Sequence, residues 1–137
     1  MSFEDIEKQL TDLRQQNELT YSYFVEHGLS RNAMLNIERQ GNYLIDSLFK
    51  YLEILNYCII VNGTPVMDQE EFGNALKNER MNRGLSQMDI LNQQKIGPTR
   101  IVSIEKGRSF RRSSLLSYLE ILGNDINFSV KSIIDVV

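Results

Sequence analysis

Gly84-Leu85-Ser86-Gln87 opens the stretch that decides the fold, which continues through Gly97-Pro98-Thr99-Arg100 to Ile104-Glu105-Lys106-Gly107-Arg108. The pattern predicts two short helices joined by a turn. Ser86 suits the N-cap of the first of them, because its hydroxyl can accept a hydrogen bond from a backbone N–H group in the first helical turn. Pro98 suits the first position of the second, where its missing N–H group costs nothing. Gly84 suits the left-handed residue that closes a preceding helix.

Much of the chain is a repeat of itself. Tyr51-Leu52-Glu53-Ile54-Leu55 recurs letter for letter 67 residues later as Tyr118-Leu119-Glu120-Ile121-Leu122, and Ile37-Glu38 recurs at the same distance as Ile104-Glu105. A self-similar chain indicates one structural unit built twice. The opening stretch therefore has a fainter copy in the first half of the sequence.

Each copy is expected to hold four helices. The first helix of the first copy is indicated by four apolar residues that recur every three or four positions: Phe3, Ile6, Leu10 and Leu13. Thr20 suits the N-cap of the next helix, as Ser86 does in the second copy. The fourth helices are expected at about 44–55 and 112–122, with stops at Asn56 and at Gly123-Asn124.

A short strand is expected after each fourth helix. Tyr57–Val61 is a continuous apolar run, and Ile126, Phe128 and Val130 alternate with polar residues in the period-two pattern of a strand. A lone strand leaves backbone groups unpaired, so the two tails should pair with each other, either within the chain or across a dimer. The apolar end Ile133–Val137 should add to that contact.

The predicted boundary between the two copies lies at or just after Asn62-Gly63-Thr64-Pro65, which has the composition of a turn. The expected domains are residues 1–63 and 64–137. Each would hold a helical bundle followed by a strand, and the strands would form a small sheet. The expected fold class is mainly α.

Charge is distributed unevenly along the chain. The net charge is −3, but residues 1–63 hold five Lys and Arg against nine Asp and Glu, whereas residues 64–137 hold ten against nine. From Lys95 to Arg112 six basic residues face a single acidic one, Glu105. A phosphate backbone is attracted by such a local excess of positive charge.

Several classes of protein are disfavoured by the sequence. The single cysteine, Cys58, excludes an intrachain disulfide and is compatible with a reducing cytosol. No apolar run is long enough to span a bilayer and the N-terminus lacks the order of a signal peptide, so we expect a soluble, cytoplasmic protein with no membrane partner. His27 is the only histidine, and neither Gly-rich phosphate loop is present. We therefore expect no enzyme, no metal and no cofactor.

A family resemblance follows from the motif residues Arg80, Gly84-Leu85-Ser86-Gln87, Ile96, Ile101 and Ile104-Glu105-Lys106-Gly107. Together with the Leu-rich helix after them, they resemble the lambda-repressor-like (Xre or Cro) helix-turn-helix family over about residues 70–123, and more weakly over 3–55. The resemblance implies two tandem lambda-repressor-like bundles. The strands look like those of antitoxin-type members, whose subunits pair through such strands.

The resemblance also implies two structural ion pairs. Members of this family typically tie the first helix to the end of the third with an Arg–Glu pair. In the second copy this would be Arg80–Glu105, and in the first copy Arg14–Glu38. Removing one partner of a buried pair typically destabilises a protein strongly, so both pairs should be important for stability.

The expected DNA contacts of the second copy also follow from the resemblance. A helix fits the major groove, with residues near its N-terminal end facing the bases. The reading positions would be Pro98, which has no polar group, and Thr99 and Ser103, which discriminate poorly. The residues expected to bind DNA are Gln87, Thr99, Arg100, Ser103, Lys106, Arg108, Arg111 and Arg112.

The first copy offers a possible second DNA site at Ser30, Arg31, Asn32 and Asn36. Arg suits guanine and Asn suits adenine, so these residues are better base readers than their counterparts. However, Tyr21 replaces the Gln of the second copy, and residues 28–46 carry no net charge. The alternative is a folded copy kept for pairing or for binding a partner.

The expected function is a sequence-specific, DNA-binding transcription regulator of the Xre type, with repression as the first expectation. Its partner would be double-stranded DNA, bound by a homodimer or by an intrachain pseudo-dimer. The rival hypothesis is an antitoxin-like or adaptor protein. Such a protein would hold another protein through the first copy or the strands, and would bind DNA only weakly.

Overall fold

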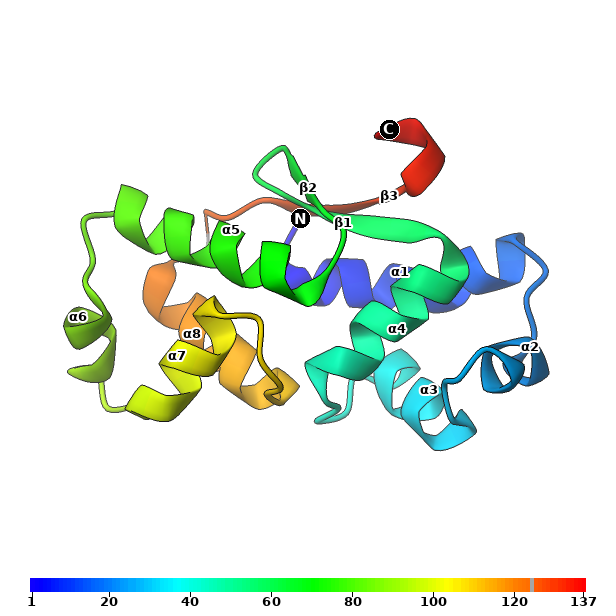
Figure 1. Ribbon diagram of the computed structural model, residues 1–137, viewed down its shortest axis with the longest axis horizontal. Coiled ribbons are helices and arrows are strands. Elements are labelled where there is room, and N and C mark those ends of the chain that lie inside the picture. Colours follow the sequence, from blue (N-terminus) through cyan, green and yellow to red (C-terminus); the bar gives the residue numbers. More distant parts are fainter. Residues whose placement is uncertain (124) are drawn as a thin grey trace.

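The computed structural model describes residues 1–123 and 125–137 and is mainly helical, with a small antiparallel sheet (Figure 1). The helices of the first half of the chain are α1 (Phe3–Gln16), α2 (Tyr21–Glu26), α3 (Arg31–Glu38) and α4 (Ile45–Leu55). Those of the second half are α5 (Gln69–Asn82), α6 (Gln87–Leu91), α7 (Pro98–Glu105) and α8 (Arg112–Leu122). The fourth helices match the predicted ranges to within one residue. The predicted stop at Gly123-Asn124 is only half described, because Asn124 lies outside the described residues.

Local capping explains where several helices begin. The side chains of Thr20, Ser30 and Ser86 each accept a hydrogen bond from a backbone N–H group in the first turn of α2, α3 and α6. Pro98 occupies the first turn of α7, after Gly97 at the N-cap. The N-cap expectations for Thr20 and Ser86 are therefore confirmed.

The hydrophobic core is continuous between the two halves. The apolar stripe of α1 faces inwards, with Phe3, Ile6 and Leu10 buried and Leu13 partly buried. Phe3 packs against Phe72 of α5, with a ring-centroid distance of 6.4 Å, and against Phe128 of the sheet at 5.8 Å. One side chain near the start of the chain therefore connects both helical sets to the sheet.

The sheet has the strand order β2-β1-β3 and is antiparallel throughout. Its strands are β1 (Tyr57–Val61), β2 (Thr64–Val66) and β3 (Phe128–Ser132). The predicted pairing of the two tails is confirmed within the chain, since β1 and β3 pair along their full length, with Ile59 opposite Val130 at the centre. Figure 1 shows the sheet on one side of the helical layer.

Strand β2 corrects the prediction of a four-residue turn. Only Asn62 and Gly63 form the turn, with φ angles of 45° and 84°, the left-handed geometry of a two-residue hairpin. Thr64 and Pro65 already pair with β1. Proline is tolerated in β2 because this strand lies at the edge of the sheet, where a missing N–H group removes no bond to a further strand.

The C-terminal residues also differ from the prediction that they extend the sheet contact. They form a short 3₁₀ helix, η1 (Ile133–Asp135), and Ile134 and Val137 are 74% and 88% exposed. The register pairs Ser132 with Tyr57, the first residue of β1. Beyond Ser132 the chain therefore has no strand residue left to pair with, although the Ile133 N–H group still donates to the Asn56 carbonyl at 3.0 Å.

Gly73 allows α5 and α7 to approach closely. A Cβ atom at this position would lie 2.3 Å from the carbonyl oxygen of Ile104 and 2.8 Å from the backbone nitrogen of Gly107. Glycine to alanine inside a free helix stabilises it by about 1 kcal/mol. Here the clash opposes that gain, and forced overpacking typically costs about 1–3 kcal/mol.

We therefore expect Gly73→Ala to lower the free energy of unfolding, measured by urea denaturation. Asn74→Ala, at the exposed neighbouring position of α5, is the control and should change stability by no more than about 0.5 kcal/mol. A stabilised Gly73→Ala variant would contradict the close packing of α5 on α7.

Candidate nucleic-acid interface

The two helices expected to meet DNA, α3 and α7, lie on the same side of the molecule, opposite the sheet (Figure 1). Each follows a shorter helix, α2 or α6, and precedes the long helix α4 or α8. The inner faces of both helices are buried: Met34 and Ile37 in α3, and Ile101 and Ile104 in α7. Both helices are thus held by apolar contacts on one face, which leaves the opposite face exposed.

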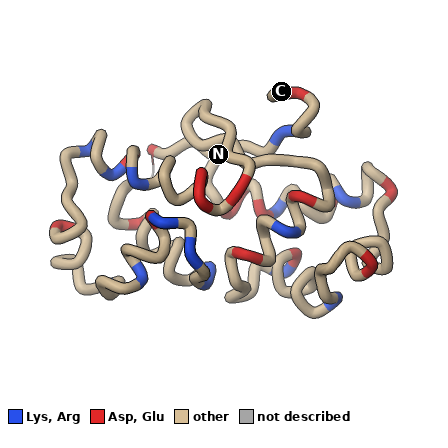
Figure 2. The backbone as a smooth tube through the Cα atoms, in the orientation of Figure 1, with Lys and Arg blue, Asp and Glu red and all other residues tan. Residues whose placement is uncertain are grey.

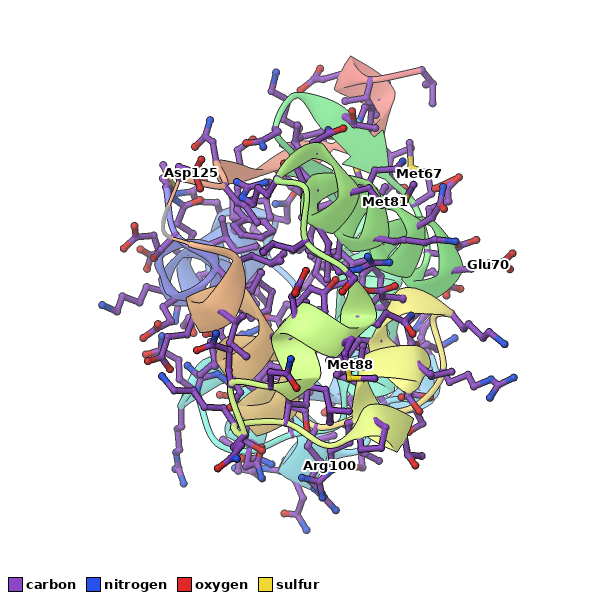
Figure 3. All side chains as sticks on the ribbon, turned by 90° about the vertical axis from the view of Figure 1, so that its left-hand side faces the viewer. Met67, Glu70, Met81, Met88, Arg100 and Asp125 are labelled. Atoms are coloured by element: carbon purple, nitrogen blue, oxygen red, sulfur yellow. The ribbon has the colours of Figure 1, made fainter. Side chains whose placement is uncertain are left out.

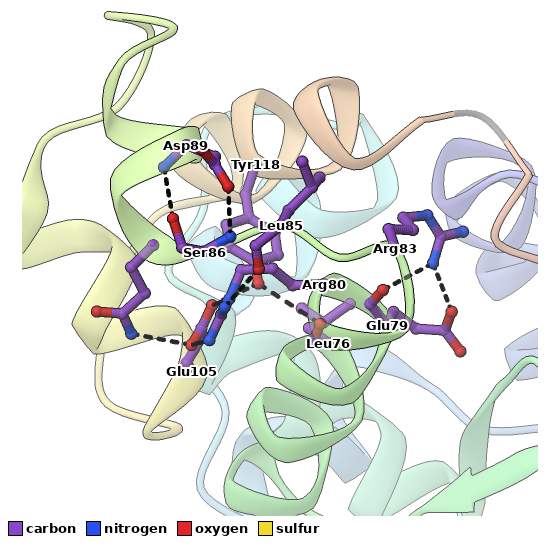
Figure 4. Close-up of polar contacts among 10 residues, drawn as sticks. Leu76, Glu79, Arg80, Arg83, Leu85, Ser86, Asp89, Glu105 and Tyr118 are labelled. Atoms are coloured by element: carbon purple, nitrogen blue, oxygen red, sulfur yellow. Dashed lines mark hydrogen bonds and ion pairs between the residues drawn. The ribbon is translucent and has the colours of Figure 1, made fainter.

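A buried ion pair fixes the end of α7. Arg80 of α5 donates to Glu105 twice, from Nε at 2.7 Å and from Nη2 at 3.0 Å, and its Nη1 donates to the Leu85 carbonyl at 2.8 Å (Figure 4). The Tyr118 hydroxyl donates to the same carboxylate at 2.6 Å. The guanidinium therefore ties together the end of α5, the start of α6 and the end of α7.

The matching pair occurs in the first half. Arg14 donates to Glu38 from Nε at 2.9 Å and from Nη2 at 3.2 Å, and it also donates to the Leu19 carbonyl. The hydroxyls of Tyr51 and Tyr21 donate to the same carboxylate at 2.8 and 3.1 Å. Both ion pairs expected from the family resemblance are present, and Tyr21 takes the place that Gln87 has in the second half.

These networks shift the pKa values of both carboxylates. Burial by itself raises the pKa of Glu105, but hydrogen bonds from Arg80, Tyr118 and Gln87 outweigh it, so the pKa is lowered. The pKa of Glu38 is lowered in the same way by Arg14, Tyr51 and Tyr21. Both glutamates are therefore held in their charged form.

Gln87 has a structural partner that the sequence did not indicate. Its side-chain nitrogen donates to Glu105 at 3.0 Å, so part of its hydrogen-bonding capacity is directed inwards. The residue is nevertheless exposed. The amide oxygen is the part of Gln87 that this inward hydrogen bond leaves for a contact with a phosphate or a base.

The exposed residues of α7 border a polar hollow. Thr99, Arg100 and Ser103 line it from α7, and Arg111 and Ser113 line it from the start of α8. Arg100 points outwards at the lower edge of the molecule (Figure 3). Arg111 donates from Nη1 to the Asn42 carbonyl at 3.1 Å, so a residue of the first half steadies its guanidinium.

The remaining basic residues of the second half lie in different surroundings. Lys106 and Arg108 are exposed on the loop after α7, beside Asp68, Glu70 and Glu71 at the start of α5 (Figure 2). Their positive charge is therefore partly offset. Lys95 forms an exposed ion pair with Glu120 at 2.7 Å, which is weak in water.

Arg112 does not have the expected exposed role. It donates to Glu7 of α1 from Nε at 2.7 Å and from Nη2 at 2.9 Å, and the Glu7 side chain is fully buried. The Tyr43 hydroxyl donates to the same carboxylate. The prediction of a phosphate contact is therefore wrong for Arg112, because its guanidinium is turned into the contact between the two halves.

The sequence gave one signal for Glu7. Phe3, Ile6 and Leu10 form the apolar stripe of α1, and Glu7 lies on the same face. A carboxylate in an apolar stripe needs a buried partner, since an unpaired buried charge is costly. The identity of that partner depends on a contact between residues 105 positions apart, which periodicity does not reveal.

The candidate residues of the first half lie on the exposed face of α3. Arg31, Asn32 and Asn36 are exposed, and Ser30 caps the helix through its hydroxyl. The guanidinium of Arg31 lies 5.5 Å from the centre of the Tyr21 ring. This cation–π contact limits the freedom of Arg31 without burying it.

Asn36 is more restrained than the other candidates on α3. A Cβ atom built on Gly41 would lie 1.7 Å from the Asn36 side-chain oxygen. The carboxamide of Asn36 therefore packs closely against the backbone of the α3–α4 loop. Asn32 is the less restrained of the two asparagines.

Metal and membrane features were also considered. Within residues 1–123 and 125–137, no three or more His, Cys, Asp or Glu side chains are grouped so that they could hold a metal ion. Over the same residues, none of the helices has the length and apolar character needed to cross a membrane.

Comparison with known proteins gives no relative: no protein-family model, no curated protein and no solved structure matches the chain.

Proposed function

We propose that this chain is a sequence-specific, DNA-binding transcription regulator of the Xre type, with two helix-turn-helix units, α2–α3 and α6–α7. One observation carries the proposal. Two structurally equivalent helices lie on one side of the molecule with polar outer faces, and each is fixed at its end by a buried Arg–Glu pair. A rigid helix with an exposed polar face is what the major groove accepts.

The electrostatics around α7 support a phosphate contact there. Arg100 and Arg111 border the same polar hollow, and three serines lie around it: Ser103, Ser109 and Ser113. Arginine and small hydroxyl side chains are common phosphate partners. We assign this hollow to the DNA backbone and the exposed outer face of α7 to the groove.

Arg111→Ala should weaken binding to all DNA sequences by a similar factor. Phosphate contacts position a protein without reading sequence. Loss of one contact should reduce the slope of log K against log salt by roughly 1. The measurement is a titration of two unrelated DNA duplexes at several salt concentrations.

The control for Arg111 is Lys131→Ala, which removes one exposed positive charge from β3 on the opposite, sheet side. It should leave the slope unchanged. A loss of affinity for only one of the duplexes would contradict the role of Arg111 as a phosphate contact.

The rival function is that of an adaptor which binds another protein. It is favoured by the acidic first half, which holds nine Asp and Glu against five Lys and Arg. Titration of a labelled random DNA pool at low and high salt separates the two. A regulator binds at low salt and loses affinity steeply as salt rises, whereas a pure adaptor shows no binding at either salt.

A further inference from the structure

We infer that a single chain binds one non-palindromic DNA site, reading sequence chiefly through α3 and holding phosphates chiefly around α7. The inference rests on the proposed function and specifies its DNA target. A symmetric dimer reads a palindrome because its two reading helices are identical. Here the two helices belong to one chain and differ in sequence.

The first argument is that the two halves pair as the subunits of a symmetric dimer do. In a twofold interface, residue i contacts residue j and j contacts i. The Ile45 N–H group donates to the Phe110 carbonyl, and the Arg112 N–H group donates to the Tyr43 carbonyl, both at 2.9 Å. Tyr43 and Ile45 precede Phe110 and Arg112 by the repeat distance of 67 residues, so these two bonds are reciprocal.

The sheet follows the same symmetry. The pairing of β1 with β3 is centred on Ile59 and Val130, and the first residue of each strand faces the last residue of the other. Both contact regions, the sheet and the pairing of Leu44 with Arg111, therefore obey one pseudo-twofold relation. The surfaces through which two separate subunits would pair in this way are already occupied by the two halves of one chain.

The second argument is that the two reading helices differ in their chemistry. At equivalent positions, α3 presents Arg31 and Asn32 where α7 presents Pro98 and Thr99. Arginine and asparagine each make bidentate contacts to one base type, whereas threonine bonds to several bases and proline has no side-chain polar group. The capacity to discriminate bases is therefore concentrated on α3.

The third argument is that positive charge is concentrated on the other side. Around α7, Arg100 and Arg111 border the polar hollow, and Lys106 and Arg108 lie in the adjoining loop. The region from residue 28 to 46 in the first half carries no net charge. The half that discriminates bases best is thus the half that attracts phosphate least, and the two halves complement each other on one duplex.

The first test is selection of bound sequences from a random DNA library with the full chain, followed by native mass spectrometry of the complex. We expect a non-palindromic consensus and one chain per duplex. A palindromic consensus with two chains per duplex would overturn the inference and leave the proposed regulator intact. Absence of any enriched sequence would overturn both.

The second test compares the equivalent variants Asn32→Ala and Thr99→Ala in the same selection. A good bidentate contact discriminates roughly ten-fold or more between bases, so Asn32→Ala should relax the consensus at one end by that factor. Thr99→Ala should relax the other end much less. Equal effects, or a larger effect of Thr99→Ala, would overturn the division between α3 and α7; thermal melts of both variants exclude a loss of fold as the cause.

Discussion

Glu105→Ala will destabilise the protein by about 3–5 kcal/mol, the usual effect of removing one partner of a buried ion pair. Glu105 accepts hydrogen bonds from three side chains on three different helices: Arg80, Tyr118 and Gln87. Alanine would leave the Arg80 guanidinium, which is only 7% exposed, without its carboxylate partner. The result is therefore expected in the stability of the whole second half and not only at α7.

Urea denaturation followed by circular dichroism measures this change. The control is Glu120→Ala, which removes a glutamate from an exposed ion pair on α8 and should change stability by less than about 1 kcal/mol. Glu38→Ala tests the matching pair of the first half and should resemble Glu105→Ala. A Glu105→Ala variant as stable as the wild type would show that the pair does not support the fold.

The same glutamate makes stability depend on pH. Because the pKa of Glu105 is lower in the folded protein than in the unfolded chain, its stabilisation is complete above the unfolded pKa of about 4.3 and is lost as pH falls through the folded pKa. The wild type should therefore lose stability on acidification below that value. In Glu105→Ala this loss should be smaller, with Glu38 still contributing its own part.

The sequence predicted the elements that depend on local patterns. Apolar spacing located α1, the capping residues Thr20 and Ser86 located α2 and α6, and the strand patterns located β1 and part of β3. The ion pairs Arg80–Glu105 and Arg14–Glu38 were predictable because they occupy the same relative positions in both copies. Pairing of the tails followed from the requirement that strands do not remain alone.

The sequence failed where distant residues decide the structure. Strand β2 was not predicted, since Thr64-Pro65 has the composition of a turn and only the edge of a sheet accepts it as a strand. Arg112 lies in a run of basic residues, and nothing local distinguishes it from its exposed neighbour Arg111. Its role is set by Glu7, which reaches it only after α1 packs against the start of α8.

Arg112→Ala will destabilise the protein by about 3–5 kcal/mol, because it leaves the fully buried carboxylate of Glu7 without a positive partner. Tyr43 still donates one hydrogen bond, but a hydroxyl does not neutralise the charge. Glu7→Ala should be destabilising as well. In the double variant both charges are absent, so its loss of stability should be smaller than the sum of the two single losses, by the coupling energy of the pair. Strictly additive losses would contradict a direct interaction.

Arg112 and its neighbour Arg111 allow the stability effect to be separated from a DNA effect. Arg111 is exposed beside the polar hollow, whereas the guanidinium of Arg112 is turned towards α1. At a temperature where both variants are fully folded, Arg111→Ala should flatten the salt dependence of DNA binding and Arg112→Ala should not. The melting temperature should respond in the opposite way, falling for Arg112→Ala and changing little for Arg111→Ala. If Arg112→Ala flattened the salt dependence as strongly as Arg111→Ala, its guanidinium would have to leave Glu7 when DNA binds, and the buried pair would be a feature of the free protein alone.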